Sequence, residues 1–514
     1  MPEWLKTAIF YEIYPQSFMD SNGDGIGDFN GIIEKLDYIK ELGCNAIWMN
    51  PCYDSPFKDA GYDVRDYKKV AERYGNIDDL RRLFAQVHAK GMHILLDLVP
   101  GHTSEEHPWF MESGQDVQNA YTDRYIWTDG WFHRAEGLPY IAGERERNGA
   151  YIINFFKCQP ALNYGFLNPK EDWQKPMDHP ACLATRAAMV DVMCYWLEMG
   201  CDGFRVDMAD SLVKSDDEVK TGTCAVWRDM LGQVRERYPE AAFVSEWNNP
   251  LSAIGMAGFD MDFFLDWSGN GYNLLMRDYD DAGRDDSFFK IGSKRDITDF
   301  LDEYLPKYET IKDKGLYCLI TGNHDMIRAA YNLDERELKL AFAFLLTLPG
   351  APFIYYGDEI GMRYRALSCK EGGYTRTGSR TPMQWNNRPN HGFSEADESL
   401  LYLPTDPGED APTVEVQQIR RDSLYNTVKE LLRIRKEEKA FSKHDNLQIL
   451  SALEGKRSFA YRRGNLVMLC NPSDHVEMLA VDMTGYEQIF KIGDGTKDDN
   501  GYILEAQSFI ICRK

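Results

Sequence analysis

Short apolar runs rich in β-forming residues alternate with amphipathic segments along most of the chain, and this alternation limits the possible folds most strongly. Such a pattern is typical of repeated βα units around a parallel sheet. We expect strands at eight runs, namely Ile9–Tyr14, Ala46–Met49, His93–Leu98, Gly203–Asp207, Phe243–Glu246, Phe263–Trp267, Leu316–Thr321 and Phe353–Tyr356. We expect helices between them, among others at Ile32–Leu42, Ile77–Lys90, Leu183–Met199 and Cys224–Tyr238. Eight such units predict an α/β fold of the (β/α)8 TIM-barrel type, with the active site at the carboxyl ends of the strands.

Two stretches interrupt this rhythm. Residues 103–180, between the third strand and its helix, are polar, aromatic and rich in turn residues, which predicts an inserted subdomain over the barrel mouth. After an amphipathic helix predicted at Ser423–Lys439, short alternating runs such as Phe459–Arg462 and Leu466–Cys470 indicate a C-terminal antiparallel β domain. The predicted units are therefore a catalytic barrel (1–102 and 181–440), an inserted subdomain B (103–180) and a C-terminal β domain (441–514).

Charge and cysteine content exclude several classes of partner. The net charge of −24 argues against nucleic acid and anionic membranes and favours a neutral or cationic ligand. Residues 1–6 show no signal-peptide pattern, and the most apolar run, Leu340–Tyr356, is broken by proline and glycine, so we expect no membrane span. The 11 cysteines include no C-x-x-C pair, which indicates reduced thiols. We therefore expect a cytoplasmic protein that acts on a small molecule.

The fourth expected strand ends in Arg205 and Asp207. Side chains alternate along a strand, so these two point the same way. A neighbouring cation favours the ionised carboxylate, and we therefore expect a lowered pKa for Asp207, which suits a nucleophile. The alternative is a structural ion pair at the end of a strand, which is the more common role of an isolated Arg-x-Asp pattern.

Further acidic and imidazole side chains follow other strands. Glu246 ends the fifth strand beside Trp247, where burial raises a glutamate pKa and suits a general acid, although a salt bridge at the barrel rim is the alternative. The third strand leads into Asp97 to His102, and the seventh into Asn323 to Asp325. These ends converge on one mouth, and two close carboxyl groups, one ionised and one protonated, are the equipment of glycoside hydrolysis with retention.

Seven stretches carry a resemblance to a known family. They are Ala60-Gly-Tyr-Asp63, Asp97-Leu-Val-Pro-Gly-His102, Gly203-Phe-Arg-Val-Asp207, Glu246-Trp247, Asn323-His-Asp325, Tyr356-Gly-Asp-Glu-Ile-Gly-Met362 and Arg380-Thr-Pro-Met-Gln-Trp385. In order and spacing they resemble the α-amylase family of glycoside hydrolases (family 13), nearest to its oligo-1,6-glucosidase and α-glucosidase branch. The resemblance implies a retaining hydrolase that acts on short α-linked gluco-oligosaccharides or disaccharides through a covalent glycosyl-enzyme.

The resemblance also implies a role for each matching residue. Asp207 would be the nucleophile, Glu246 the general acid and then base, and Asp325 the carboxylate that holds substrate hydroxyls in the transition state. The implied substrate-binding residues are Arg205, which would orient Asp207, the sugar-binding His102 and His324, the stacking platform Tyr62, and the pair Asp59 and Arg376. Such a pair closes the pocket of exo-acting α-glucosidases, which remove single glucose units. A surface salt bridge is the alternative for this pair.

An acidic loop after the first strand predicts a separate metal site. Oxygen donors at alternate positions with glycine at the sixth resemble an EF-hand loop, although Gly31 stands where that loop has its bidentate glutamate. Related glucosidases carry a similar loop with Ca²⁺ or Mg²⁺. We therefore expect a structural Ca²⁺ (or Mg²⁺) held by Asp20, Asn22, Asp24, the Ile26 carbonyl and Asp28, with a metal-free loop of Asx turns as the alternative.

Three positions depart from the family pattern. Gly101 replaces an asparagine that ligates calcium in amylases, so we expect no second metal there. Ala161 replaces the usual aspartate of a signature segment, and Met208 stands where Val or Thr is linked to the choice between α-1,6 and α-1,4 bonds, so the linkage stays open.

Two other functions remain as alternatives. A transglycosylase or isomerase, such as trehalose synthase or a sucrose-converting enzyme, would use the same machinery with a sugar hydroxyl in place of water. A non-catalytic relative, like the heavy chains of amino-acid transporters, is disfavoured because Asp207, Glu246 and Asp325 are all retained.

Overall fold

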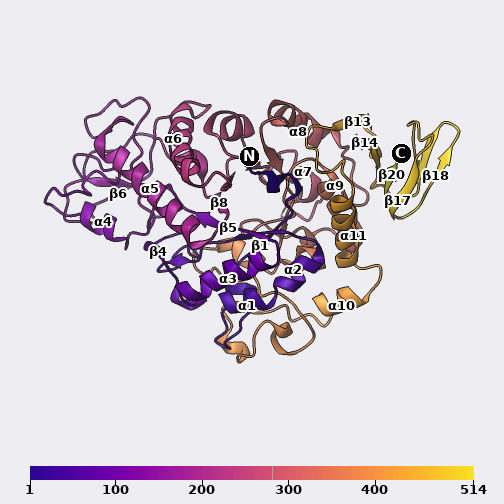
Figure 1. Cartoon of the computed structure of the whole chain (residues 1–514), viewed down its shortest axis with the longest axis horizontal. Helices are drawn as coiled ribbons and strands as arrows, with labels where there is room; N and C mark the ends of the chain where they lie inside the picture. The colour runs from indigo at the N-terminus through magenta and orange to yellow at the C-terminus, as the bar shows by residue number, and fades with distance from the viewer. Residues whose placement is uncertain (281) are drawn as a thin grey trace.

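A closed barrel of eight parallel strands forms the centre of the computed structural model, which describes residues 1–280 and 282–514 (Figure 1). The order around the sheet is β11-β10-β9-β8-β5-β2-β1-β12. The strands are β1 (Phe10–Ile13), β2 (Ala46–Met49), β5 (His93–Leu98), β8 (Gly203–Val206), β9 (Ala242–Ser245), β10 (Met261–Phe263), β11 (Leu316–Cys318) and β12 (Phe353–Tyr355). Just beyond β11, the Thr321 N–H donates to the Phe353 carbonyl at 2.9 Å, which joins the two edges. The predicted (β/α)8 barrel is confirmed.

The strands end earlier than several of the sequence predictions. Asp207 and Glu246 fall just after β8 and β9, because the chain turns outward at the carboxyl edge of the barrel. The largest difference concerns the sixth strand, predicted at Phe263–Trp267 and observed at Met261–Phe263. The apolar residues that follow β10 continue as a loop, in which Trp267 is 55% exposed. The apolar side chain of Trp267 therefore lies at the surface of the barrel mouth and does not extend the strand.

Helices surround the barrel. They are α1 (Phe29–Glu34), α2 (Leu36–Leu42), α3 (Ile77–Ala89), α5 (Pro180–Met199), α6 (Thr221–Arg237), α7 (Asn273–Met276), α8 (Thr298–Ile311), α9 (Glu335–Thr347), α10 (Val414–Ile419) and α11 (Leu424–Glu437). The helix predicted at Ile32–Leu42 is split at Lys35, whose ψ of 4° is not helical. Helix α5 begins at Pro180, earlier than predicted, because proline fits the first turn, where its missing N–H has no intrahelical partner.

Aromatic side chains fill the barrel interior below the mouth. The rings of Phe10 and Phe353 stack with centroids 4.2 Å apart, and Phe263 meets Phe353 edge-on at 4.8 Å. Trp48 packs on Phe263 at 5.5 Å and donates its indole N–H to Asp97 at 3.1 Å. The barrel is therefore a packed core that supports the polar groups above it rather than a channel.

The stretch between β5 and α5 forms the projection that carries α4 and β6 in Figure 1. It contains α4 (Pro108–Ser113) and an antiparallel pair, β6 (Tyr140–Ala142) and β7 (Ala150–Ile152). It has a small core of its own, made of Ile126, Ala135, Ile152, Ala161, Phe166 and Trp173. A second small pair, β3 (Tyr53–Asp54) and β4 (Asp66–Val70), holds the loop with Asp59 and Tyr62.

Antiparallel strands follow α11 and lie at the far end of the molecule (Figure 1). One sheet has the order β13-β14-β15-β20-β17, and a smaller one the order β16-β19-β18. The strands are β13 (Leu447–Ala452), β14 (Phe459–Arg463), β15 (Leu466–Asn471), β16 (Glu477–Leu479), β17 (Glu487–Ile492), β18 (Gly495–Asp498), β19 (Gly501–Leu504) and β20 (Ser508–Arg513). Phe459 packs on Phe344 of α9 with ring centroids 5.3 Å apart, which attaches this β domain to the barrel. The predicted C-terminal antiparallel β domain is confirmed, whereas the boundaries between the units stay predictions.

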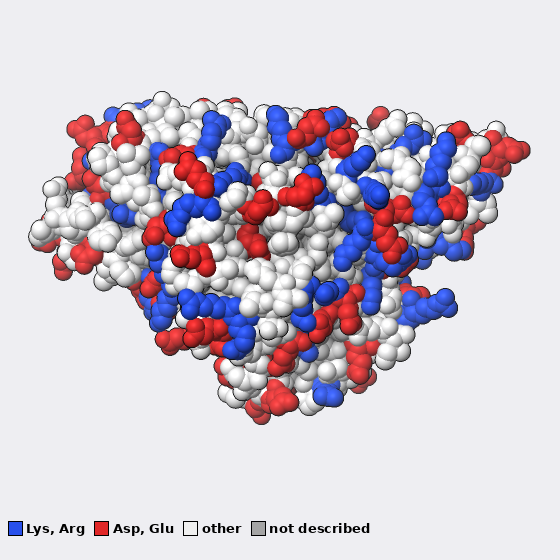
Figure 2. Space-filling view, in the orientation of Figure 1, with Lys and Arg blue, Asp and Glu red and all other residues white. Residues whose placement is uncertain are grey.

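Surface charge is mixed over the face shown in Figure 2, where basic and acidic side chains alternate without one large basic area. The described helices include none that is long and apolar enough to cross a membrane.

Candidate active site

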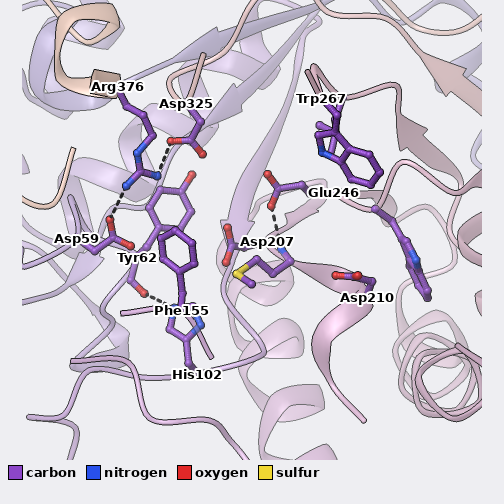
Figure 3. A pocket seen from close by; sticks show the side chains of 13 residues that line it. Asp59, Tyr62, His102, Phe155, Asp207, Asp210, Glu246, Trp267, Asp325 and Arg376 are labelled. Carbon is purple, nitrogen blue, oxygen red and sulfur yellow. Dashed lines mark hydrogen bonds and ion pairs between the residues drawn. The ribbon is translucent and has the colours of Figure 1, made fainter. Parts of the chain in front are cut away.

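A pocket of about 300 Å³ opens at the carboxyl ends of the barrel strands (Figure 3). This volume is at the lower end of the range for small-molecule sites. The pocket is lined by Asp59, Tyr62, His102, Phe155, Asp207, Met208, Asp210, Glu246, Trp247, Leu265, Trp267, Asp325 and Arg376. All three predicted catalytic carboxylates therefore reach one cavity, although they come from the ends of β8, β9 and β11.

One buried guanidinium connects the acidic groups. Arg205 is 1% exposed, and its Nη1 bonds Asp97 at 2.8 Å and Asp207 at 3.1 Å. Its Nη2 bonds Glu246 at 2.8 Å. Because a guanidinium presents its donors in a rigid fork, it fixes Asp207 and Glu246 close together and relative to each other. The sequence placed Arg205 beside Asp207 alone, so the bond to Glu246 is an addition from the structure.

The pKa of Asp207 is raised well above its usual range, mainly by burial and then by the charge of Glu246. The predicted lowering is therefore wrong, because these two effects outweigh the attraction of Arg205. The pKa of Glu246 is also raised, mainly by burial, as predicted. Because the two buried carboxyl groups cannot easily be ionised at the same time, they share a proton at a pH at which isolated carboxyl groups would have lost it. The pKa values therefore describe the Asp207–Glu246 pair rather than either residue alone.

Strained backbone positions Glu246. Met208 has φ 40° and ψ 48°, a left-handed conformation that is uncommon for a side chain with a Cβ. In this conformation its N–H donates to Glu246 Oε2 at 2.9 Å (Figure 3). Strain of this kind persists where the surroundings enforce it, and here it supplies a hydrogen bond to the second carboxylate.

Asp325 has a different environment. Its Oδ1 accepts bonds from Arg376 at 3.0 Å and Arg380 at 2.8 Å. Burial opposes ionisation of Asp325, but the charges of the Arg376 and Arg380 guanidinium groups lower its pKa below the usual range. Asp325 is therefore ionised at a pH at which the Asp207–Glu246 pair still holds a proton. Arg380 belongs to one of the seven family-like stretches, yet no role was predicted for it.

Asp59 and Arg376 meet at one end of the pocket. Arg376 lies on a short 3-10 helix, Tyr374–Ser379, and its Nη2 is 3.4 Å from Asp59 Oδ1 (Figure 3). Gln159 of the inserted stretch donates to Asp59 Oδ2 at 2.7 Å. Asp59 is only 3% exposed, which rules out the surface salt bridge that the sequence left open. Burial raises the pKa of Asp59 to about 6.

Tyr62 lines the pocket, and His324, one of the two predicted sugar-binding histidines, packs against it. Its ring stacks on His324 with centroids 5.4 Å apart, and its hydroxyl lies 2.6 Å from His324 Nε2 and 3.0 Å from Asp97. His324 is fully buried and bonds Glu12 through Nδ1 at 2.8 Å. Burial lowers its pKa well below the usual range, so the imidazole is neutral. The structure thus places His324 where it supports Tyr62 and Asp325, outside the pocket lining.

His102 lines the pocket with both ring nitrogens already bonded within the chain. Nε2 lies 3.1 Å from the Tyr62 carbonyl, and Nδ1 lies 3.2 Å from the Asn154 side-chain amide. Burial lowers its pKa to about 3, so it is neutral and donates from Nε2 while Nδ1 accepts from the amide. The neutral ring presents an apolar edge and no charge to the pocket.

Sequence reasoning missed several pocket residues. Phe155 comes from the inserted stretch, Leu265 and Trp267 come from the loop after β10, and Asp210 follows Asp207 by one turn. Of these residues, only Asp210 could have been found from the sequence. It is an acidic residue shortly after a barrel strand, which is the pattern that identified Asp207 and Glu246.

The predicted metal loop is a series of Asx turns. Asp20 accepts from the N–H groups of Asn22, Gly23 and Gly25 and from the Ser394 hydroxyl. Asp28 accepts from Ser21 and Gly31, and the Asn22 and Asp24 side chains accept from the N–H groups two residues on. Among the described residues, no group of three or more His, Cys, Asp or Glu side chains is arranged to hold a metal. The carboxylates face backbone donors, and the Ca²⁺ stays a prediction.

Calcium binding at this loop has a direct test. Asp20, Asp24 and Asp28 place three carboxylates in one short loop, and Ca²⁺ prefers such oxygen ligands, which would be gathered in the folded state only. We expect a Tm a few degrees lower in chelator than in millimolar Ca²⁺, measured by calorimetry, because a ligand of the folded state stabilises it. Asp24→Ala, at an exposed position, should remove the difference. A Tm that is the same with and without Ca²⁺ would contradict the metal and leave the Asx turns as the whole explanation.

The fold and the pocket together define a class of protein. A (β/α)8 barrel whose strand ends place two close carboxyl groups on one arginine, with a third ionised carboxylate opposite, has the groups that glycosidic bond cleavage requires. A family model described as "Alpha amylase, catalytic domain" matches residues 12–444. The chain belongs to the α-amylase family of glycoside hydrolases, family 13, and is an enzyme of the glycosidase type.

Similar proteins within this family carry names that state different activities. The chain is 33% identical to the trehalose synthase/amylase TreS of Mycolicibacterium smegmatis over 85% of this chain and 77% of that protein. It is 31% identical to probable oligo-1,6-glucosidase 3 of Bacillus subtilis over 95% of this chain and 92% of that protein. Among solved structures, the alpha-glucosyl transfer enzyme XgtA matches with a TM-score of 0.81 and 26% identity, and the match covers 100% of both chains.

Proposed function

We propose that this enzyme is a retaining α-glucoside hydrolase that removes single glucose units from short α-linked gluco-oligosaccharides or disaccharides. The observation that carries this proposal is the pocket itself, in which the Asp207–Glu246 pair lies between the Asp59–Arg376 contact, which closes one end, and the side of Trp267 (Figure 3). A closed end of this kind admits the non-reducing end of a chain and leaves no room for further sugar units beyond it.

In the proposed reaction each carboxylate has one task. The Asp207 oxygen attacks C1 of the glucose and forms an ester, while Glu246 donates its proton to the departing glycosidic oxygen. Water then attacks C1, gives its proton to Glu246 and releases Asp207. Asp325, ionised beside Arg376 and Arg380, accepts hydrogen bonds from sugar hydroxyls, and the Tyr62 ring faces the same sugar.

The second candidate function is an isomerase or transglycosylase in which a sugar hydroxyl replaces the attacking water. The similarity to a trehalose synthase/amylase and to an alpha-glucosyl transfer enzyme favours it. Met208 lines the pocket beside both catalytic carboxylates, and its side chain would contact the sugar whose linkage is being cut.

Product analysis separates the two functions. The protein is incubated with maltose, isomaltose, sucrose or trehalose, and the products are resolved by chromatography over time. We expect free glucose as the main product, with the α-anomer formed first, because two displacements at C1 retain the configuration. Mainly disaccharide products would contradict hydrolysis and establish the second candidate, whereas no turnover of any α-glucoside would contradict both.

Acidification is expected to weaken substrate binding through Asp59. Its pKa of about 6 means that it loses its charge below that pH, and with it the ionic part of its bonds to Arg376 and to substrate hydroxyls. We expect KM for the preferred substrate to rise about 10-fold between pH 7 and pH 5, the worth of one hydrogen bond to a charged group.

Asp59→Asn provides the control for this pH effect. The variant should have a raised KM that no longer changes over the same range, as measured by steady-state kinetics. Because folding raises the pKa of Asp59, its ionisation costs stability above pH 6, and the variant should melt no lower than the parent at pH 7. An unchanged pH dependence of KM in Asp59→Asn would contradict this assignment.

A further inference from the structure

A buried glutamate lies behind the pocket lining, without an ion pair to any described lysine or arginine. Glu12 of β1 is 0% exposed, and its Oε1 lies 2.8 Å from His324 Nδ1 and 3.2 Å from the Asn50 side-chain amide. Its Oε2 has no hydrogen-bonding partner among the described residues. A carboxylate here would be buried with one oxygen unpaired, which is costly, whereas the carbonyl oxygen of a neutral acid costs far less.

The contacts of His324 test the two places that its proton can take. The neutral imidazole carries a single N–H, either on Nδ1 or on Nε2. With the proton on Nδ1, the ring N–H would face the Asn50 amide, itself a donor, at 3.1 Å, and the Nε2 lone pair would face the Asp325 carboxylate at 3.4 Å. The Tyr62 hydroxyl would also have to donate to Nε2, which leaves its 3.0 Å contact with Asp97 without that proton. This tautomer therefore conflicts with three contacts.

With the proton on Nε2, each of these contacts has a donor and an acceptor. The Nε2–H faces the Tyr62 oxygen at 2.6 Å and Asp325 Oδ2 at 3.4 Å, and the Tyr62 hydroxyl donates to Asp97. Nδ1 then accepts from the Asn50 amide. Its 2.8 Å contact with Glu12 Oε1 is a hydrogen bond only if the glutamate supplies the proton. This tautomer therefore requires Glu12 to be a neutral acid.

The surroundings of Glu12 favour the same state. Burial raises its pKa well above the usual range, and the charges of Asp97 and Asp325 add to that effect. The Asn50 hydrogen bond and the positive charge of Arg205 act in the opposite direction, but less strongly than burial. The titratable groups that face Glu12 are His324, Arg205 of β8, Asp97 of β5, Asp325 and Tyr355 of β12. Glu12 therefore keeps its proton at a pH at which an exposed glutamate would have lost it.

We propose that Glu12 stays protonated and donates a hydrogen bond to His324 Nδ1, and that this bond fixes the Nε2–H tautomer of the imidazole. Glu12 is then a positioning residue, because the Nε2–H faces two groups of the pocket, Tyr62 and Asp325 (Figure 3). An Nε2 lone pair would repel the ionised Asp325, whereas an N–H attracts it and keeps its orientation. This role rests on the proposed function, in which both groups contact the reacting glucose.

Melting curves of Glu12→Gln and the parent between pH 5 and pH 8 test the protonation of Glu12. Because folding raises the pKa of Glu12, its contribution to stability is complete below the unfolded pKa and is lost as the pH rises towards the folded value. Glutamine is neutral at every pH, so the Tm of the variant relative to the parent should rise by a few degrees over this range. Glu34→Gln, an exposed glutamate of α1, is the matched control, and its Tm relative to the parent should stay constant.

Steady-state kinetics at pH 7 test the positioning role. The substrates are the best of the four disaccharides named above and α-glucosyl fluoride, in which fluoride replaces the departing sugar. Glu12→Met keeps the length of the side chain but has no donor, so we expect kcat/KM to fall about 10- to 100-fold on both substrates, the cost of an unsatisfied buried group. The amide of Glu12→Gln can donate to Nδ1, so this variant should recover most of the activity.

Three results would contradict the proposal. A Tm difference between Glu12→Gln and the parent that does not change with pH would show that Glu12 is ionised. Parent-like activity of Glu12→Met, or a loss confined to the disaccharide, would show that Glu12 does not position the groups around the reacting glucose. A folded Glu12→Gln as inactive as Glu12→Met would show that a donor at this position is not enough.

Failure of the proposed function would look different. The melting comparison needs neither turnover nor a folded Glu12→Met, so it decides the protonation of Glu12 in any case. A parent enzyme that transfers no glucose from any α-glucoside, together with the expected pH dependence of Tm, would contradict the proposed function and leave Glu12 as a neutral donor to His324.

Discussion

Asp207→Asn is expected to lower kcat by at least about 10⁴-fold on every α-glucoside, because an amide cannot form the ester with C1. The loss should be as large on α-glucosyl fluoride as on a disaccharide, since the nucleophile is needed whatever group departs. Steady-state and single-turnover kinetics measure it. Asp302→Asn, an exposed aspartate on α8, should leave kcat unchanged.

The same substitution should leave the protein folded. Folding raises the pKa of Asp207, so its side chain favours the folded state below its unfolded pKa and loses that contribution as the pH rises through the folded value. At neutral pH a neutral asparagine removes this cost, and Arg205 keeps its bonds to Asp97 and Glu246. We expect a Tm equal to or above that of the parent. A folded variant with ordinary activity would contradict the assignment of Asp207 as nucleophile.

Glu246→Gln is expected to show a different pattern of loss. Glutamine cannot donate a proton to a departing sugar, so kcat/KM on a disaccharide should fall by about 10²- to 10⁴-fold, the range for one general acid. On α-glucosyl fluoride the first displacement should proceed almost normally, because fluoride leaves without a proton. The glycosyl-enzyme should then accumulate, which mass spectrometry of the intact protein would detect.

Two observations decide whether Glu246 acts as the acid and base. Azide needs no base to attack C1, so it should release the accumulated intermediate as α-glucosyl azide. Since the proton of the Asp207–Glu246 pair is removed with Glu246, the alkaline decline of kcat/KM should also disappear in the variant. Glu198→Gln, at an exposed position of α5, is the matched control. An equal loss on both substrates without accumulation would contradict the role.

Local patterns predicted the barrel, and the meeting of three carboxylates at its mouth, correctly in outline. Strands of a parallel barrel are buried on both faces and therefore appear as short, continuous apolar runs, which the sequence shows directly. Side chains at the carboxyl ends of such strands share one mouth, so Asp207, Glu246 and Asp325 could be brought together from their positions alone. The sixth strand was misplaced because Leu265 and Trp267 are apolar for a different reason, as part of the pocket lining.

Electrostatic properties could not be predicted in the same way. The pKa of Asp207 depends on the balance between its burial, the charge of Glu246 and the attraction of Arg205, and the sequence showed only the last of these at close range. Asp325 has the opposite shift because Arg376 and Arg380, more than 50 positions along the chain, bond it directly. Such a balance depends on distances between segments that no local pattern contains.

The parallel barrel with an acidic mouth was determined by the sequence itself, because strand burial and strand-end placement follow from local periodicity. The tertiary structure alone decided which residues close the pocket at one end and which line its opposite side. Asp59, Gln159 and Arg376 come from three separate segments and meet only after folding, as do Asp210 and Trp267 on the opposite side. Residues outside regular strands have no register that fixes their neighbours, and packing between distant segments sets their positions.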